Sequence, residues 1–112
     1  MLLRVVVREV DGQVVLSAVG EVDTSTADMV PDAVDAVLDA GGVRVFLDLS
    51  QVTFIDSSGA SAVLAAHRAA EARDARLAVV SPSRQALRVI ELLGLEDLLR
   101  IYDDLPAAIR DL

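Results

Sequence analysis

The stretch from Phe46 to Gly59, with the sequence FLDLSQVTFIDSSG, joins a β-rich apolar segment to small hydroxyl residues and a glycine. Val43–Leu49 alternates poorly between polar and apolar residues and is rich in Val and Leu, which is typical of a central strand buried on both faces. A short apolar run, Val52–Ile55, stops at Asp56, where a helical period begins and continues to about Arg73. The stretch therefore predicts a buried strand that leads into the N-terminus of a helix.

Upstream of this stretch, the sequence predicts an antiparallel hairpin. Leu3–Val10 and Gln13–Val19 are both rich in Val and Leu, and the dipeptide Asp11-Gly12 lies between them. Asp-Gly between two apolar runs is among the strongest signals for a two-residue hairpin turn. We therefore expect two antiparallel strands at the start of the chain.

A helix is predicted over Thr24–Ala40, because its apolar residues repeat with a helical period and four aspartates occupy the opposite face. Gly41 and the following glycine end this helix. Pro31 is unfavourable in the body of a helix, so the helix either starts late or bends there. Ser25 followed by Asp28 resembles a weak capping box.

Downstream of Gly59, helices and strands continue to alternate. Ser81-Pro82 is typical of an N-cap followed by proline at the first helical position. Beyond the helix that ends near residue 73, we expect a strand at Arg76–Val80, a helix closed by Gly94, a strand near Arg100–Tyr102 and a last helix opened by Asp104-Leu105-Pro106. The resulting order, ββαβαβαβα, predicts an α/β domain with a mixed, mainly parallel β-sheet and an N-terminal antiparallel hairpin.

The composition is that of one folded domain with an acidic surface. The chain has 112 residues, of which 54% are hydrophobic and 25% are charged, which is typical of a globular domain and excludes disorder. Ten arginines, without any lysine, against 18 acidic residues give a net charge of −8. This charge disfavours direct binding to nucleic acid or to an anionic membrane surface.

Several chemistries are excluded by residue types that the chain lacks or hardly uses. The absence of cysteine excludes disulfides, thiol catalysis and cysteine-ligated metals, and the single histidine leaves no histidine-rich metal site. The longest apolar run, Ala62–Ala66, has five residues, so we expect no membrane insertion. We expect a cytoplasmic protein without a cofactor.

The most distinctive chemical feature is Asp56-Ser57-Ser58-Gly59, at the junction between strand and helix. Exposed backbone N–H groups and the positive end of the helix dipole make such a junction a natural anion site. An N-cap role for Asp56, Ser57 or Ser58 explains the same residues, since helices commonly have such caps, and capping is the first role we expect for Asp56. The chemistry of the chain alone leaves both interpretations open.

Other segments give this element a wider context. They are Gly20-Glu21-Val22-Asp23, Asp48-Leu49-Ser50, the apolar lead-in Val52–Ile55, and Leu92-Leu93-Gly94-Leu95. Together with Asp56–Gly59 they resemble the anti-sigma factor antagonist group of STAS domains. The resemblance runs from about Arg4 to Leu112 with nearly family-typical spacing, and it implies a single STAS domain over residues 1–112 with a core of about 4–112.

What the resemblance implies is a non-enzymatic switch. The unphosphorylated protein would bind an ATP-binding anti-sigma factor serine kinase and release a sigma factor, and the kinase would reverse this by phosphorylating Ser58. A phosphatase would reset the switch. Asp23 would lie beside the serine and help the kinase to recognise it, and Ser57 would be an interface residue rather than the acceptor. The implied partner-binding residues are Asp23, Asp56, Ser57, Ser58, Gly59 and Ala60.

Two other functions remain as alternatives. In an enzyme, Asp48 or Asp56 could hold Mg²⁺, but position 50 is Ser50 where aspartate-nucleophile phosphatases need a second Asp, and no P-loop or Gly-x-Ser-x-Gly motif is present. His67 lies about 13 Å along the helix from Ser58, which argues against a Ser–His pair and for a half-buried packing residue. A STAS accessory domain of a membrane transporter or stress-signalling complex, without the phosphorylation switch, is the second alternative.

Overall fold

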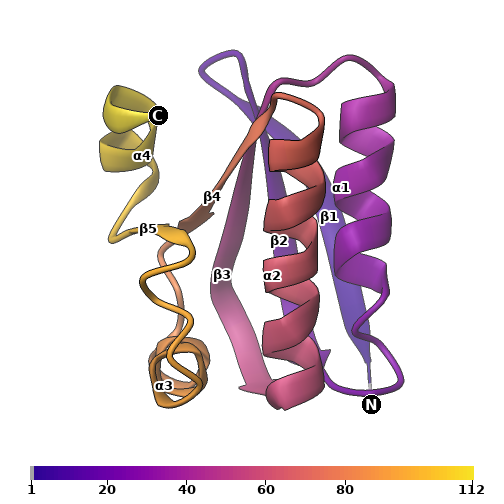
Figure 1. The fold of residues 1–112 in the computed structure, drawn as a ribbon, viewed down its shortest axis with the longest axis vertical. Helices are drawn as coiled ribbons and strands as arrows, with labels where there is room; N and C mark the ends of the chain where they lie inside the picture. The colour runs from indigo at the N-terminus through magenta and orange to yellow at the C-terminus, as the bar shows by residue number, and fades with distance from the viewer. Residues whose placement is uncertain (1) are drawn as a thin grey trace.

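The computed structural model describes residues 2–112 and confirms the predicted order of elements, ββαβαβαβα (Figure 1). The elements are β1 (Leu3–Val10), β2 (Gln13–Val22), α1 (Met29–Asp39), β3 (Arg44–Ile55), α2 (Ser57–Ala72), β4 (Arg76–Val80), α3 (Arg84–Leu92), β5 (Arg100–Tyr102) and α4 (Leu105–Asp111). In this part of the chain, no helix has the length and apolar character needed to cross a membrane.

The strands form one mixed sheet in the order β1-β2-β3-β4-β5. The first two are antiparallel, and Val10 pairs with Gln13 across the predicted turn. Asp11 and Gly12 both have positive φ, 52° and 78°, as a type I′ hairpin turn requires. The other neighbouring strands are parallel. The predicted mixed sheet and its N-terminal hairpin are confirmed.

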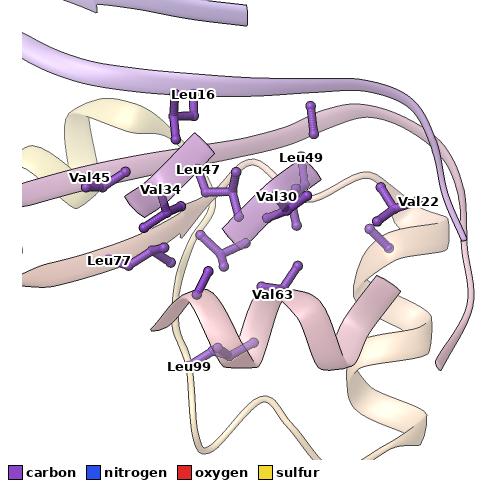
Figure 2. Close-up of a cluster of buried hydrophobic side chains, with 14 of the residues drawn as sticks. Leu16, Val22, Val30, Val34, Val45, Leu47, Leu49, Val63, Leu77 and Leu99 are labelled. Atoms are coloured by element: carbon purple, nitrogen blue, oxygen red, sulfur yellow. The ribbon is translucent and has the colours of Figure 1, made fainter. Parts of the chain in front are cut away.

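The two faces of the sheet carry separate hydrophobic clusters, because successive strand residues point to opposite faces. The larger cluster packs the sheet against α1, α2 and α3, and Figure 2 labels Leu16, Val22, Val30, Val34, Val45, Leu47, Leu49, Val63, Leu77 and Leu99 among its members. The smaller cluster packs the opposite face against α4 through Val15, Phe46, Ala78, Val80 and Ala108. Each large apolar side chain that is fully buried stabilises the fold by about 1.5–3 kcal/mol.

The two separate apolar runs of the sequence belong to one continuous strand in the structure, β3. It pairs with β4 only as far as Asp48, which is opposite Val80. Its pairing with β2 continues to Ile55, opposite Val22, across register shifts near Ser17 and Gly20. The second half of β3 therefore extends past the end of β4 and reaches the end of β2.

The helix α1 starts later than Thr24. It begins at Met29, so Pro31 lies in the first turn, where its missing N–H would have no intrahelical partner in any case. The capping box expected from Ser25 and Asp28 was wrong. Asp28 occupies the N-cap position without a side-chain cap hydrogen bond, and Ser25 instead donates to Asp23.

The helix α3 also starts later than predicted. Ser83, not Ser81, is the N-cap, and its hydroxyl accepts a hydrogen bond from the Ala86 N–H at 3.2 Å. The predicted pair Ser81-Pro82 lies in the preceding loop, where Ser81 has a φ of 50° and its hydroxyl donates to the Asp103 carbonyl. The cap of the last helix was predicted correctly, since α4 is capped by the side chain of Asp104.

Candidate functional site

Two loops meet at the end of the sheet where β2 and β3 terminate. Val22 is the register partner of Ile55, and the Asp56 N–H donates to the Val22 carbonyl at 3.3 Å. Both α1 and α2 begin at this end, which lies at the bottom of Figure 1. The fold thus brings residues 23–28 and 56–59 together, although α1 and β3 lie between them in the sequence.

Asp56 is the N-cap of α2, as expected. Its backbone is extended, and its Oδ1 accepts a hydrogen bond from the Gly59 N–H at 3.0 Å. The first helical bond follows directly, because the Ala60 N–H donates to the Asp56 carbonyl. The N–H groups of Ser57 and Ser58 lie in the first turn, which has no intrahelical acceptors, so the positive end of the helix dipole lies at these two serines.

Gly59 allows α2 to start in close contact with β2. A Cβ atom at this position would lie 2.3 Å from the Val22 carbonyl oxygen and 2.6 Å from Cγ1 of Ile55. Both distances are far below van der Waals contact, so no larger residue fits without moving the helix. Gly59 therefore shapes the site by allowing this approach, and it is itself buried.

The serines and Ala60 differ in accessibility. Ser57 is exposed and Ser58 is half-buried, so both reach the surface. Ala60 is 0% exposed and belongs to the main hydrophobic cluster. Ala60 therefore lies outside the surface that a partner can contact, because its side chain is fully buried.

Ser58 has a hydrogen-bond partner that the sequence did not indicate. Its hydroxyl oxygen lies 3.2 Å from the Thr24 hydroxyl oxygen, within hydrogen-bond distance. Thr24 immediately follows Asp23 at the end of β2, and the parallel pairing of β2 with β3 places it here. The carboxyl ends of neighbouring parallel strands meet at one edge of a sheet. The position of Thr24 just after a strand is therefore the signal that could have identified it as a neighbour of Ser58.

Asp23 organises the loop that presents Thr24. Its Oδ1 accepts hydrogen bonds from the Ser25 N–H and hydroxyl at 2.9 and 2.7 Å, and from the Thr26 N–H at 3.2 Å. The hydrogen bond from the Ser25 hydroxyl is the main cause of the lowered pKa of Asp23, so this carboxylate stays ionised to a lower pH than a typical aspartate. Among residues 2–112, Asp23 makes no hydrogen bond to Ser58. Thr24 makes that contact instead.

Gln85, at the start of α3, holds the end of β3 in place. Its Oε1 accepts from the Ile55 N–H at 2.8 Å, and its Nε2 donates to the Ile55 carbonyl at 3.3 Å. The Ser83 N–H also donates to the Leu49 carbonyl. Beyond the end of β4, the second half of β3 has no neighbouring strand on this side. The hydrogen bonds from α3 and its N-cap satisfy the backbone groups that such a strand would otherwise pair with. No local signal in the sequence indicates Gln85, because it is thirty positions from Ile55.

We predict that Gln85→Ala loosens the loop that leads into Ser58. The change leaves a partly buried N–H and carbonyl of Ile55 without partners, which costs about 1–3 kcal/mol. Hydrogen exchange at the Ile55 and Gly59 amides should accelerate strongly. Gln51→Ala, an exposed change in the same strand, is the matched control and should leave both rates unchanged. Equal exchange in both variants would contradict the positioning role of Gln85.

Histidine and the acidic side chains are the groups that could hold a metal ion in this cysteine-free chain. No group of three His, Asp or Glu side chains among residues 2–112 is arranged to hold a metal ion. His67 is half-buried on α2 and lies 3.9 Å from Glu71, and burial is the main cause of its lowered pKa. This environment agrees with the predicted packing role.

Comparison with known proteins agrees with this architecture. The family model described as the STAS domain matches residues 4–108. The chain is 31% identical over 107 residues to the anti-sigma-F factor antagonist RsfB of Mycobacterium tuberculosis, covering 96% of this chain and 87% of that protein. It is 29% identical over 82 residues to the anti-sigma-B factor antagonist of Listeria monocytogenes, covering 73% of this chain and 72% of that protein.

A solved structure agrees as well. The crystal structure of an anti-sigma factor antagonist from Mycobacterium paratuberculosis superimposes with a TM-score of 0.84 and 28% identity, covering 97% of this chain and 92% of that one. The mixed sheet, the order of its helices and the family match over residues 4–108 agree with one another. This chain belongs to the STAS domain family.

Proposed function

We propose that this protein is an anti-sigma factor antagonist that switches partners through phosphorylation of Ser58. The observation that carries the proposal is the position of the Ser58 hydroxyl in the first turn of α2, at the surface and within hydrogen-bond distance of Thr24. The names of the similar proteins support the same function. The unphosphorylated form binds an ATP-binding anti-sigma factor kinase, so that the sigma factor is released.

In the proposed reaction, the partner kinase transfers the γ-phosphoryl group of its ATP to Ser58. This protein is the substrate of the reaction rather than the enzyme. The Ser58 Oγ forms a bond to the γ-phosphorus, the bond between that phosphorus and ADP breaks, and the hydroxyl proton is lost. The product carries about −1.5 to −2 additional charges at pH 7. A phosphatase reverses the step by hydrolysis.

The local environment favours a phosphate inside this protein and disfavours it at an interface. The free N–H groups and the dipole of α2 stabilise a negative charge at its N-terminus by about 0.3–1 kcal/mol. A partner surface that fits the neutral hydroxyl instead meets a new charge beside Asp23 and Asp56. Folding therefore survives phosphorylation while binding is lost.

Affinity capture from the host lysate tests this proposal. Wild-type protein and Ser58→Asp serve as parallel baits, and the bound proteins are identified by mass spectrometry. Recovery of a small ATP-binding kinase by the wild type alone is the expected result. Equal recovery of a membrane transporter by both baits would contradict it and support an accessory domain without a switch.

We predict that Asp23→Ala slows phosphorylation of Ser58 several-fold with little loss of stability. The carboxylate is half-buried and its hydrogen bonds go only to Ser25 and Thr26 in the loop that presents Thr24, so the urea midpoint should stay close to that of the wild type. The initial phosphorylation rate and a urea titration measure the two effects. Asp35→Ala, on the exposed face of α1, is the control. Unchanged phosphorylation in Asp23→Ala would remove Asp23 from the site.

A further inference from the structure

The outer strand β1 leaves one long edge of the sheet open. It has eight residues, includes no proline and pairs only with β2. The opposite edge, β5, has three residues and leads directly to α4. Natural proteins usually protect sheet edges by shortening or covering them. Within residues 2–112, β5 is short, whereas β1 is long and pairs on one side only, and its charged residues Arg4, Arg8 and Glu9 restrict pairing to a segment of complementary charge.

The direction of the free backbone groups on β1 follows from one hydrogen bond. The Glu21 N–H donates to the Leu2 carbonyl at 3.0 Å, so the backbone groups of Leu2 point toward β2. Along an antiparallel strand, alternate residues direct these groups to opposite sides. The N–H and carbonyl groups of Leu3, Val5, Val7 and Glu9 therefore point away from the sheet. They form a template for an additional strand.

An apolar groove lies beside this edge, between β1 and α1. Figure 1 shows α1 running alongside the sheet next to β1. Val7, which is 64% exposed, lines the groove on the strand side. Small side chains of α1 line its other wall, so a volume of about 550 Å³ stays open. The wall residues are Ala33, Ala36 and Val37 of α1, and Ala40 at its C-cap. The side chains of an added strand would enter this groove at every second residue.

Charges around the groove indicate what kind of segment fits. Glu9 is the register partner of Val14, which lines the groove, and Asp32 is exposed one position before Ala33. These carboxylates make the surroundings of the groove acidic. Arg4 lies on the other face of the sheet, since it is an even-numbered residue of β1. The net charge of −8 on each molecule opposes covering the edge with a second copy.

We propose that β1 and this groove bind an extended segment of another protein as a sixth strand. The segment has apolar residues at alternating positions that face the groove, a basic residue beside Glu9 and an acidic residue beside Arg4. Main-chain hydrogen bonds to Val5 and Val7 provide affinity, and the groove provides specificity. This surface is separate from the Ser58 site, and the inference does not depend on the proposed switch.

A random twelve-residue peptide library displayed on phage is the probe, with the purified protein as bait. Selected peptides are synthesised, and their Kd is measured for the wild type and for Ala36→Leu, which fills the groove at an exposed position. Ala65→Leu makes the same change at an exposed position on α2. We expect alternating apolar peptides that bind Ala36→Leu at least tenfold more weakly and Ala65→Leu equally well.

The backbone contribution is tested separately. Val7→Pro removes an N–H that points away from β2, so it should abolish peptide binding without breaking the β1–β2 ladder. Amide chemical shifts of Leu3, Val5, Val7 and Glu9 in the wild type should change on binding. The proposal is overturned if no peptide is enriched, or if Ala36→Leu binds the selected peptides as well as the wild type does. A wild-type dimer that Val7→Pro disperses in sedimentation would also overturn it, because a second copy would then cover the edge.

Discussion

Ser58→Asp is expected to bind the anti-sigma kinase at least tenfold more weakly than the wild type, a loss of about 1.4 kcal/mol or more. The carboxylate places a negative charge in the first turn of α2, on a surface that already carries Asp23 and Asp56. A partner surface that fits a neutral hydroxyl then pays for desolvation and like-charge repulsion. Ser58→Ala keeps the site neutral, so it should bind like the wild type and resist phosphorylation. Isothermal titration calorimetry measures these affinities.

A matched change separates the position of the charge from its presence. Ser50→Asp adds the same charge at an exposed residue of β3, away from the first turn of α2, and should leave the affinity nearly unchanged. Both Asp variants should unfold at urea concentrations close to that of the wild type. Equal kinase affinity for the wild type, Ser58→Ala and Ser58→Asp would remove Ser58 from the interface.

Gly59→Ala is expected to lower the free energy of unfolding by about 2 kcal/mol or more, since overpacking in a dense interior typically costs about 1–3 kcal/mol. The added methyl group would lie 2.3 Å from the backbone carbonyl of Val22. Because backbone cannot rotate away as a flexible side chain can, the start of α2 must move. That movement also disturbs the Asp56 cap and the contact between Ser58 and Thr24. Urea denaturation measures the loss.

The sign of the change in the free energy of unfolding distinguishes a steric conflict at Gly59 from an ordinary helix position. In a helix interior without steric conflict, Gly→Ala stabilises by about 1 kcal/mol. A stabilised Gly59→Ala variant would therefore show that the close approach to β2 does not constrain this position. Ser61→Ala, an exposed substitution in the same helix, is the control and should stay within about 0.5 kcal/mol of the wild type.

Most of the fold was predictable because local signals agreed with the tertiary arrangement. The hairpin followed from Asp11-Gly12, and the last helix followed from Asp104 with a nearby proline. Errors appeared where two starting signals compete within a few residues. Ser81 and Ser83 are both suitable N-caps, and only the backbone conformation shows that α3 begins after the second. The late start of α1 was one of two outcomes that Pro31 allowed.

The site was predictable where it is local in the sequence and not where it depends on tertiary contacts. The role of Asp56 as a cap follows from its place between an apolar run and a helical period. Thr24 reaches Ser58 only through the pairing of β2 with β3, and Gln85 reaches Ile55 only because β3 extends past β4. The resemblance implied that Ala60 is a partner-binding residue, although the helix turns its side chain into the core.

The most direct test of the central claim is the site of phosphorylation. Purified wild-type protein is incubated with the captured kinase and Mg·ATP, and the product is analysed by intact mass and fragment-ion spectra. We predict one phosphoryl group on Ser58, its absence from Ser58→Ala, and release of the kinase from the modified protein. A protein that stays unmodified, or one that carries the phosphoryl group on Ser57 or Thr24, would contradict the account.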